Sequence, residues 1–236
     1  MKLHRASLAK AGTVLAALLA LAASTALWAQ RELCNTQCAP KGMWSDEITV
    51  KLEKRIANTG STDMQETIKA LSNASGMPLR YLWTLYRVGG PDFDGAFARL
   101  EPDNKRVIYY GAGFDDRFTR GEGPDLWYAR VVLSHEMAHH LLQHTFADDL
   151  RVTDELEADR FAGCYMAALK RLKKSSASEQ EVLKIYEQSA PFKASGSHPG
   201  RAARIAIVKE GWAHGSAEPA GEDRTTSACF KMKRLP

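Results

Sequence analysis

Two histidines and a glutamate at a short, fixed spacing are the residues of this chain most suited to chemistry. His135, Glu136 and His139 form the pattern H-E-x-x-H within residues 131–144, which read VVLSHEMAHHLLQH. The apolar neighbours, and the absence of Gly and Pro, favour a buried helix. On a helix, positions i and i+4 share one face with their Cβ atoms about 5–6 Å apart. Both imidazoles could therefore bind one metal ion.

The chemistry that this pattern indicates is that of a zinc hydrolase. Zinc binds imidazole nitrogens at about 2.0–2.1 Å, and Glu136 is near enough to act as general base on a metal-activated water without being a ligand. His140 and His144 also share a face, but no glutamate lies between them at the right place, and we interpret them as surface or supporting residues. Because three fixed positions also occur by chance, the rest of the chain must support the interpretation.

A zinc site with two histidines from one helix needs a third protein ligand and leaves a position for water. Residues 154–159, DELEAD, open a second helix that we expect Thr153 to cap, and Glu155 can supply a carboxylate from it. Asp159 lies on the same face and can accept the free N–H of a liganding histidine. Glu157 competes as a ligand but points about 200° away around the helix. The alternative is that these acids only favour the start of a capped helix.

A further histidine comes from much later in the chain. His198 precedes Pro199, which would open a last helix that runs to about Glu210. A histidine held at a helix start could donate a hydrogen bond to the oxyanion of a tetrahedral intermediate. The alternative is an ordinary surface histidine.

A small sheet is expected before the metal helix. Three short runs rich in aromatic and β-branched residues are typical of strands, at residues 80–88, 95–100 and 105–110. A tight turn at residues 102–104 joins the last two into an antiparallel pair. We interpret Tyr109 and Tyr110 as cross-strand packing residues rather than catalytic ones.

Helices make up most of the remaining chain in this interpretation. The metal helix is expected to begin at Pro124 and to run to about Phe146, and periodicity predicts further helices over residues 45–56, 63–74 and 178–189. The predicted fold class is α+β and mostly helical, with a small antiparallel sheet packed beside the H-E-x-x-H helix.

Residues 1–29 have the composition of a bacterial signal peptide. Basic residues precede an apolar run of Ala and Leu over residues 11–27, and cleavage is expected after Ala29 or Ala26. The alternative is an uncleaved N-terminal membrane anchor. No second run is long enough to span a bilayer, so we expect a periplasmic or secreted protein with no membrane span after cleavage.

The charge balance gives no reason to expect a nucleic-acid partner. Residues 1–29 hold three of the 32 Lys and Arg and none of the 28 Asp and Glu, which leaves a formal charge of about +1 on the rest. The length suits one domain with a substantial core. We divide the mature chain into a Cys-bearing segment at residues 30–44, a zinc-site domain at residues 45–214 and a tail at residues 215–236.

Four cysteines, an even number in an exported chain, predict two disulfide bonds. They are Cys34, Cys38, Cys164 and Cys229, and three pairings are possible. A local Cys34–Cys38 bond would leave Cys164 to pair with Cys229, which would tie the tail to the core. The alternative is a four-cysteine zinc site, which usually needs two closely spaced pairs, and only Cys34 and Cys38 make one.

Three motifs together resemble a known family. H-E-x-x-H, E-x-x-A-D and H-P-x-x-x-x-R, in this order and at these distances, look like those of the gluzincin metallopeptidases related to the CAAX prenyl protease and the bacterial membrane heat-shock protease. The similarity covers residues 45–212 and is greatest to the soluble, exported bacterial members, as in the segments ELEADRFAG and SHPGRAARIAIVKEGW. The resemblance implies a zincin-like domain with one Zn²⁺ per chain.

The resemblance also implies roles for individual residues. His135, His139 and Glu155 would be zinc ligands, Glu136 the catalytic base, and Asp159 the support of a liganding histidine.

Three further residues receive less definite roles from the same resemblance. His198 would assist the intermediate or, in a latent state, block the metal. Arg204 would be structural or substrate-facing. The strand beside the cleft in that family corresponds here to residues 94–98, which include Phe97, and a polypeptide substrate could add to its edge as an extra strand.

The sequence therefore predicts a zinc-dependent endopeptidase that hydrolyses peptide bonds of exported or cell-envelope proteins. The alternative from another class is a non-catalytic, zinc-stabilised chaperone or assembly module of the cell envelope, which would need neither Glu136 nor an open cleft. A latent protease in which His198 caps the zinc is a second alternative, which differs in regulation rather than in chemistry.

Overall fold

The structure is a computed structural model, and it describes residues 56–57, 64, 66–69, 84–88, 95–100, 106–144, 151–189, 199–217 and 227–236. The helices and strands follow one another in the order β1 (Ile56–Ala57), β2 (Thr84–Val88), β3 (Ala96–Leu100), β4 (Arg106–Gly111), α4 (Ala112–Thr119), α5 (Pro124–Leu141), α6 (Val152–Arg171), α7 (Glu179–Ser189), α8 (Arg201–Ser216) and α9 (Ser227–Phe230). The fold is mostly helical, as predicted.

Several predictions concern residues outside this set. The signal peptide of residues 1–29, the pair Cys34 and Cys38, and His198 all lie outside the described residues. Among the described helices, none is both long and apolar enough to cross a membrane.

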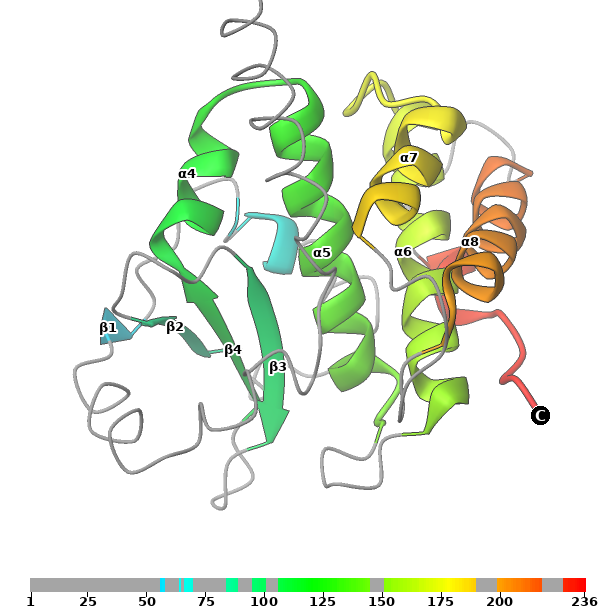
Figure 1. Ribbon diagram of the computed structural model, residues 1–236, viewed down its shortest axis with the longest axis horizontal. Coiled ribbons are helices and arrows are strands. Elements are labelled where there is room, and N and C mark those ends of the chain that lie inside the picture. Colours follow the sequence, from blue (N-terminus) through cyan, green and yellow to red (C-terminus); the bar gives the residue numbers. More distant parts are fainter. Residues whose placement is uncertain are drawn as a thin grey trace, which may run out of the picture. The chain divides into compact units, whose positions relative to one another are not determined.

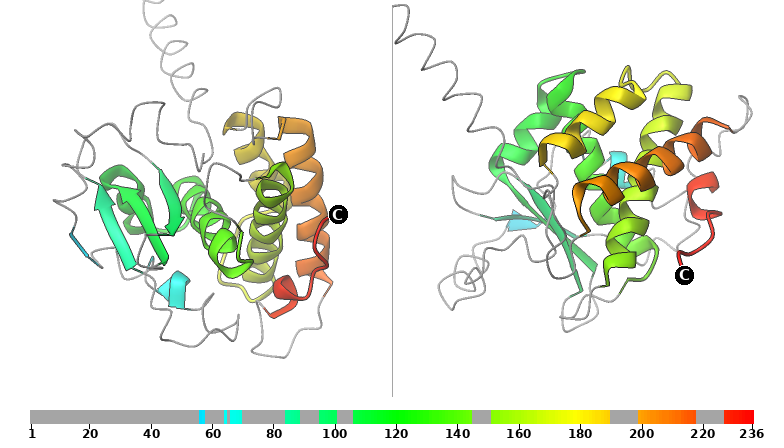
Figure 2. Two further views of the ribbon diagram at one scale, coloured as in Figure 1. Left: turned by 90° about the horizontal axis from the view of Figure 1, so that it is seen from below. Right: turned by 45° about the vertical axis from the view of Figure 1, so that its right-hand side comes forward.

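Helix α5 lies between the sheet and the other large helices (Figures 1 and 2). The sheet packs on one side of it and α6 on the other, while α8 packs on α6 and α7 lies alongside them. Every residue from Val131 to Leu141 is buried. A helix covered on both sides has no solvent-facing polar stripe, so the polar side chains of this segment are buried together with its apolar ones.

The sheet has four strands in the order β1-β2-β4-β3. β3 and β4 are antiparallel, with Phe97 opposite Tyr109, as predicted. β2 pairs parallel with β4, and β1 joins β2 antiparallel, so the predicted antiparallel pair is part of a larger, mixed sheet. Ile56, expected in a helix, lies in β1. In this strand order β4 lies between β2 and β3. The sequence did not predict the order, because the alternation of residues within a strand does not specify which strands lie beside it.

The aromatic residues of the hairpin are packing residues. Phe97 and Tyr109 stack across the two strands with ring centroids 5.0 Å apart, and both side chains are buried, as is Tyr110. Stacking across an antiparallel pair contributes to sheet stability. Phe97 therefore packs in the core of the described structure.

Helix α5 ends five residues before the predicted Phe146, because the chain reverses. Gln143 has a left-handed backbone with φ of 57°, the Gln143 N–H donates to the His140 carbonyl at 3.1 Å, and the His144 N–H donates to the His139 carbonyl at 2.9 Å. These two bonds make a Schellman motif, which closes the last turn of a helix. It folds His144 back beside His139.

Other helix ends also differ from the prediction. Arg151, not Thr153, is the residue that caps α6, and its N–H donates to Asp154 Oδ2 at 3.1 Å. Helix α4, which has eight residues, was not among the predicted helices, and α8 extends past Glu210 to Ser216. Helix ends are the least certain feature of periodicity arguments, because caps depend on local hydrogen bonds.

Helices α6 and α8 approach each other closely through glycines. A Cβ atom placed on Gly163 would overlap the backbone of Val208, and one placed on Gly211 would overlap the backbone of Arg160. A side chain at either position would push the helices apart. This close packing sets the position of α8, and with it Arg204, against α6.

A disulfide bond joins Cys164 on α6 to Cys229 on α9. This is one of the pairings that the sequence left open, the one expected if Cys34 and Cys38 pair locally. The bond ties the C-terminal tail to the helix that carries Glu155 and Asp159.

Replacement of Lys173 by glycine is expected to stabilise the fold by about 0.5–1 kcal/mol. Lys173 is exposed and follows α6 with φ of 59°, a conformation that glycine adopts without steric cost. For a domain of this size, the melting temperature should rise by about 1–4 °C. Lys174→Gly, at a position without positive φ, is the control and should not stabilise. An unchanged or lower melting temperature for Lys173→Gly would contradict the left-handed helix end.

Candidate metal centre

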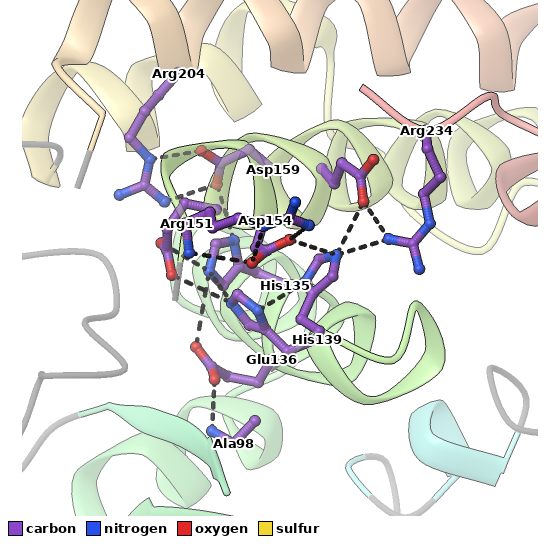
Figure 3. A network of polar contacts seen from close by, with 12 residues as sticks. Ala98, His135, Glu136, His139, Arg151, Asp154, Asp159, Arg204 and Arg234 are labelled. Atoms are coloured by element: carbon purple, nitrogen blue, oxygen red, sulfur yellow. Dashed lines mark hydrogen bonds and ion pairs between the residues drawn. The ribbon is translucent and has the colours of Figure 1, made fainter. Parts of the chain in front are cut away.

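Three side chains from two helices converge at the centre of the molecule. His135 and His139 come from α5, where Figure 3 shows them side by side, and Glu155 comes from α6. The His135 and His139 Nε2 atoms are 3.2 Å apart. Glu155 Oε2 lies 3.6 Å from His135 Nε2, and Glu155 Oε1 lies 3.4 Å from His139 Nε2. All three side chains are buried.

These distances fit a shared metal ion. Ligand atoms about 2.0–2.1 Å from a tetrahedral metal ion are about 3.3–3.4 Å from one another, close to the three distances between the donor atoms. Neither carboxylate oxygen of Glu155 has a hydrogen-bond partner, although its side chain is fully buried. A buried carboxylate without hydrogen bonds is unfavourable, and a metal ion between it and the imidazoles would be bound directly by its oxygens. The group can therefore hold a metal ion.

Asp159 and Arg204 orient His135. Asp159 Oδ1 lies 2.9 Å from His135 Nδ1, an arrangement in which the ring N–H donates to the carboxylate and Nε2 is turned toward Glu155. Arg204, on α8, donates from Nε to Asp159 Oδ2 at 2.6 Å and from Nη2 to Oδ1 at 2.7 Å. Bonds of this kind hold both the tautomer and the orientation of a liganding histidine.

Arg204 is buried, and its side chain contacts two neighbouring helices. Its side chain is 1% exposed, and its guanidinium lies over the ring of Tyr186 on α7, 5.4 Å from the ring centroid. Burial would raise the pKa of Asp159, but the charge of Arg204 lowers it below its ordinary value. Tyr186 was not singled out from the sequence, because its position matches the apolar face of an ordinary helix.

The two histidines have opposite electrostatic environments. Burial alone would lower the pKa of His135, but the carboxylates of Asp159 and Glu155 outweigh it and raise this pKa to about 10. Burial, together with the charge of His135, lowers the pKa of His139 well below its usual value. A metal ion that binds here would displace a proton from His135, so metal binding is coupled to proton release.

Glu136 lies beside the three donors without being one of them. Its Oε2 accepts a hydrogen bond of 2.6 Å from the Ala98 N–H of β3 (Figure 3), and its Oε1 lies 4.0 Å from His135 Nε2. The side chain is fully buried. A carboxylate is thereby held between the edge strand of the sheet and the candidate metal ligands.

Both remaining histidines of α5 and its end are buried, and neither is a surface residue. His140 Nε2 donates to the Val107 carbonyl of β4 at 3.0 Å and so joins the helix to the sheet. His144 Nδ1 lies 2.9 Å from His139 Nδ1, and His144 Nε2 lies 3.0 Å from Glu157 Oε2. His144 therefore supports a candidate ligand, as one of the two sequence interpretations held.

Glu157 has a role that sequence reasoning missed. It does not reach the three donors, as its direction around α6 predicted, but it accepts hydrogen bonds from His144, from Arg234 and from the Leu235 N–H, the last at 2.6 Å. No signal in the sequence links residues 157 and 234, because they meet only through the path of the tail.

The chain was also compared with models of known protein families, with characterised proteins and with solved structures, and no match was found. The interpretation of the site therefore depends on its own geometry.

Proposed function

We propose that this protein is a zinc-dependent endopeptidase of the gluzincin type that hydrolyses peptide bonds of exported or cell-envelope proteins. The observation that carries the proposal is the position of Glu136, a buried carboxylate that adjoins the three donors and is bound from its other side by a strand. A purely structural metal site needs a closed set of ligands and no additional carboxylate beside them.

In this proposal, different residues bind the metal ion, transfer the proton and orient a ligand. His135, His139 and Glu155 would hold the ion. Zinc, when bound, supplies a Lewis acid that polarises a carbonyl and lowers the pKa of a coordinated water to about 7. Glu136 takes the proton of the attacking water and passes it to the leaving amine. Asp159 keeps His135 in the tautomer that directs Nε2 to the metal.

The edge strand β3 is the part of the described structure best placed to receive a polypeptide. It ends the strand order β1-β2-β4-β3. Gly95 bonds to Gly111 on the β4 side, and Ala98, three residues later, directs its N–H to Glu136 instead. An extended substrate that added to this edge would bring a peptide group next to the general base.

Removal and return of the metal test this proposal directly. The purified, zinc-loaded protein should cleave an unfolded protein such as reduced casein. The chelator 1,10-phenanthroline should lower the rate at least about 100-fold, and added Zn²⁺ should restore it. Chelator treatment that leaves cleavage unchanged would contradict a metallopeptidase. Suppression of aggregation without any cleavage would instead favour the non-catalytic chaperone module.

A further inference from the structure

Residues 227–236, the last part of the C-terminal tail, lie along one face of α6. Four α6 residues with the spacing i, i+3, i+4 and i+7 contact the tail, and their tail partners run in the opposite direction along the chain: Cys164 with Cys229, Phe161 with Phe230, Arg160 with the Lys233 carbonyl, and Glu157 with Arg234 and Leu235. The spacing 157, 160, 161 and 164 places all four on one helix face. The tail is thus bound along its length, from the disulfide to its last residues.

The contact of Arg234 and Leu235 with Glu157 is linked to the candidate metal ligand His139 through the side chains of Glu157 and His144. Arg234 Nη1 and the Leu235 N–H both donate to the carboxylate of Glu157. Glu157 Oε2 is 3.0 Å from His144 Nε2, and His144 Nδ1 is 2.9 Å from His139 Nδ1. His144 Nε2 also lies 3.0 Å from Arg234 Nη1, so Arg234 contacts both members of the His144–Glu157 pair. A proton on His139 Nδ1, donated to His144 Nδ1, would leave His139 Nε2 as an acceptor for a metal ion.

The two candidate histidine ligands are supported in similar ways from two parts of the chain. His135 is held by a carboxylate, Asp159, which is held by Arg204 of α8. His139 is held through His144 by a carboxylate, Glu157, which is bound by Arg234 of the tail. The first arginine is buried, whereas the side chain of the second is 53% exposed.

A second metal ion is a less favourable explanation of the same residues. His144, Asp154 and Glu157 are near enough to one another to hold a cation. However, Arg234 already binds Glu157, and Arg151 Nη2 binds Asp154 Oδ1 at 3.0 Å. The two guanidinium groups supply the positive charge that the carboxylates need, so the cluster does not require a metal ion.

We propose that the C-terminal tail positions the metal centre: Arg234 and Leu235 hold Glu157, and Glu157 holds His139 through His144. Arg234 is therefore a positioning residue for metal binding, although it is distant from the donor atoms. The inference rests on the proposed metal centre. Partners that orient a liganding histidine typically change metal affinity about 10–100-fold, so the tail should affect zinc affinity by a similar factor.

The test is the zinc dissociation constant of the full-length purified protein, measured by competition with a chelating dye. Arg234→Ala should weaken zinc binding about 10–100-fold, and Arg234→Lys should regain part of the loss, because an ammonium group can still donate to Glu157. Lys233→Ala is the matched control: its side chain is exposed and the tail contact uses its backbone carbonyl, so zinc affinity should stay within about twofold.

Three further measurements separate positioning from folding. The metal-free Arg234→Ala protein should melt within about 2 °C of the wild type, because the side chain is half exposed. Glu157→Gln, which alters the acceptor instead of the donor, should weaken zinc binding in the same direction. Cys229→Ser, which frees the tail from α6, should do so as well.

The possible results are distinguishable. Wild-type zinc affinity in Arg234→Ala and Glu157→Gln would overturn the role of the tail while leaving the metal centre intact. A loss as large in Lys233→Ala as in Arg234→Ala would also overturn it, because the effect would then not depend on the contact with Glu157. Failure of the wild type itself to bind zinc would instead contradict the metal centre on which the inference rests.

Discussion

Replacement of Glu136 by glutamine is expected to leave the protein folded and able to bind zinc but to lower kcat for peptide hydrolysis about 10³-fold. Glutamine has the same shape as glutamate, and its amide oxygen can keep the hydrogen bond from the Ala98 N–H. The amide cannot take a proton from the attacking water. Because Glu136 is not among the three donors, metal binding should be preserved.

The measurement combines metal analysis with cleavage of a fluorogenic peptide. Zinc content should be equal in wild type and Glu136→Gln, while kcat for cleavage should fall about 10³-fold. Glu187→Gln is the control, since this glutamate of α7 is exposed, and it should behave as wild type. Cleavage by Glu136→Gln at the wild-type rate would show that another group is the base, and loss of zinc would show that Glu136 is a ligand.

Replacement of Glu155 by alanine is expected to weaken zinc binding by more than about 100-fold. Loss of a residue that only supports a ligand typically weakens metal binding about 10–100-fold, and the loss of a ligand itself should have a larger effect. The change removes the one carboxylate of the three-donor group and leaves two imidazoles, which are too few for a stable site in a protein. The variant should lose hydrolysis as a consequence of losing the metal, whereas Glu136→Gln should lose hydrolysis with the metal retained.

Thermal melting with and without zinc provides a second readout for Glu155→Ala. A ligand that binds only the folded state stabilises it by about 4 kcal/mol at a thousandfold excess over its dissociation constant. Added zinc should therefore raise the melting temperature of the wild type and of Glu187→Ala, the exposed control, but not that of Glu155→Ala. An equal zinc-induced rise in all three proteins would mean that Glu155 is not a ligand.

Much of the candidate site could be predicted because its parts repeat with the period of a helix. His135 and His139 share a face of α5, and Glu155 and Asp159 share a face of α6, for the same geometric reason. The sequence alone therefore determined which side chains could meet on each helix. It also determined that the described structure would be mostly helical, with a hairpin before the metal helix.

The tertiary structure alone decided how these pieces support one another. The parallel pairing of β2 with β4, the bond from Ala98 to Glu136, and the contact between Arg204 and Asp159 join segments that are distant in the sequence. Contacts of this kind depend on how whole elements pack, which no local pattern records.

The contacts of His144 and of the C-terminal tail were also decided by the tertiary structure alone. A single left-handed residue, Gln143, returns His144 to His139, and a disulfide together with the contacts along one face of α6 brings Arg234 to Glu157. A backbone reversal at a residue other than glycine leaves almost no trace in the sequence. Local periodicity thus determined the candidate ligands, and the packing of distant segments decided what holds them in place.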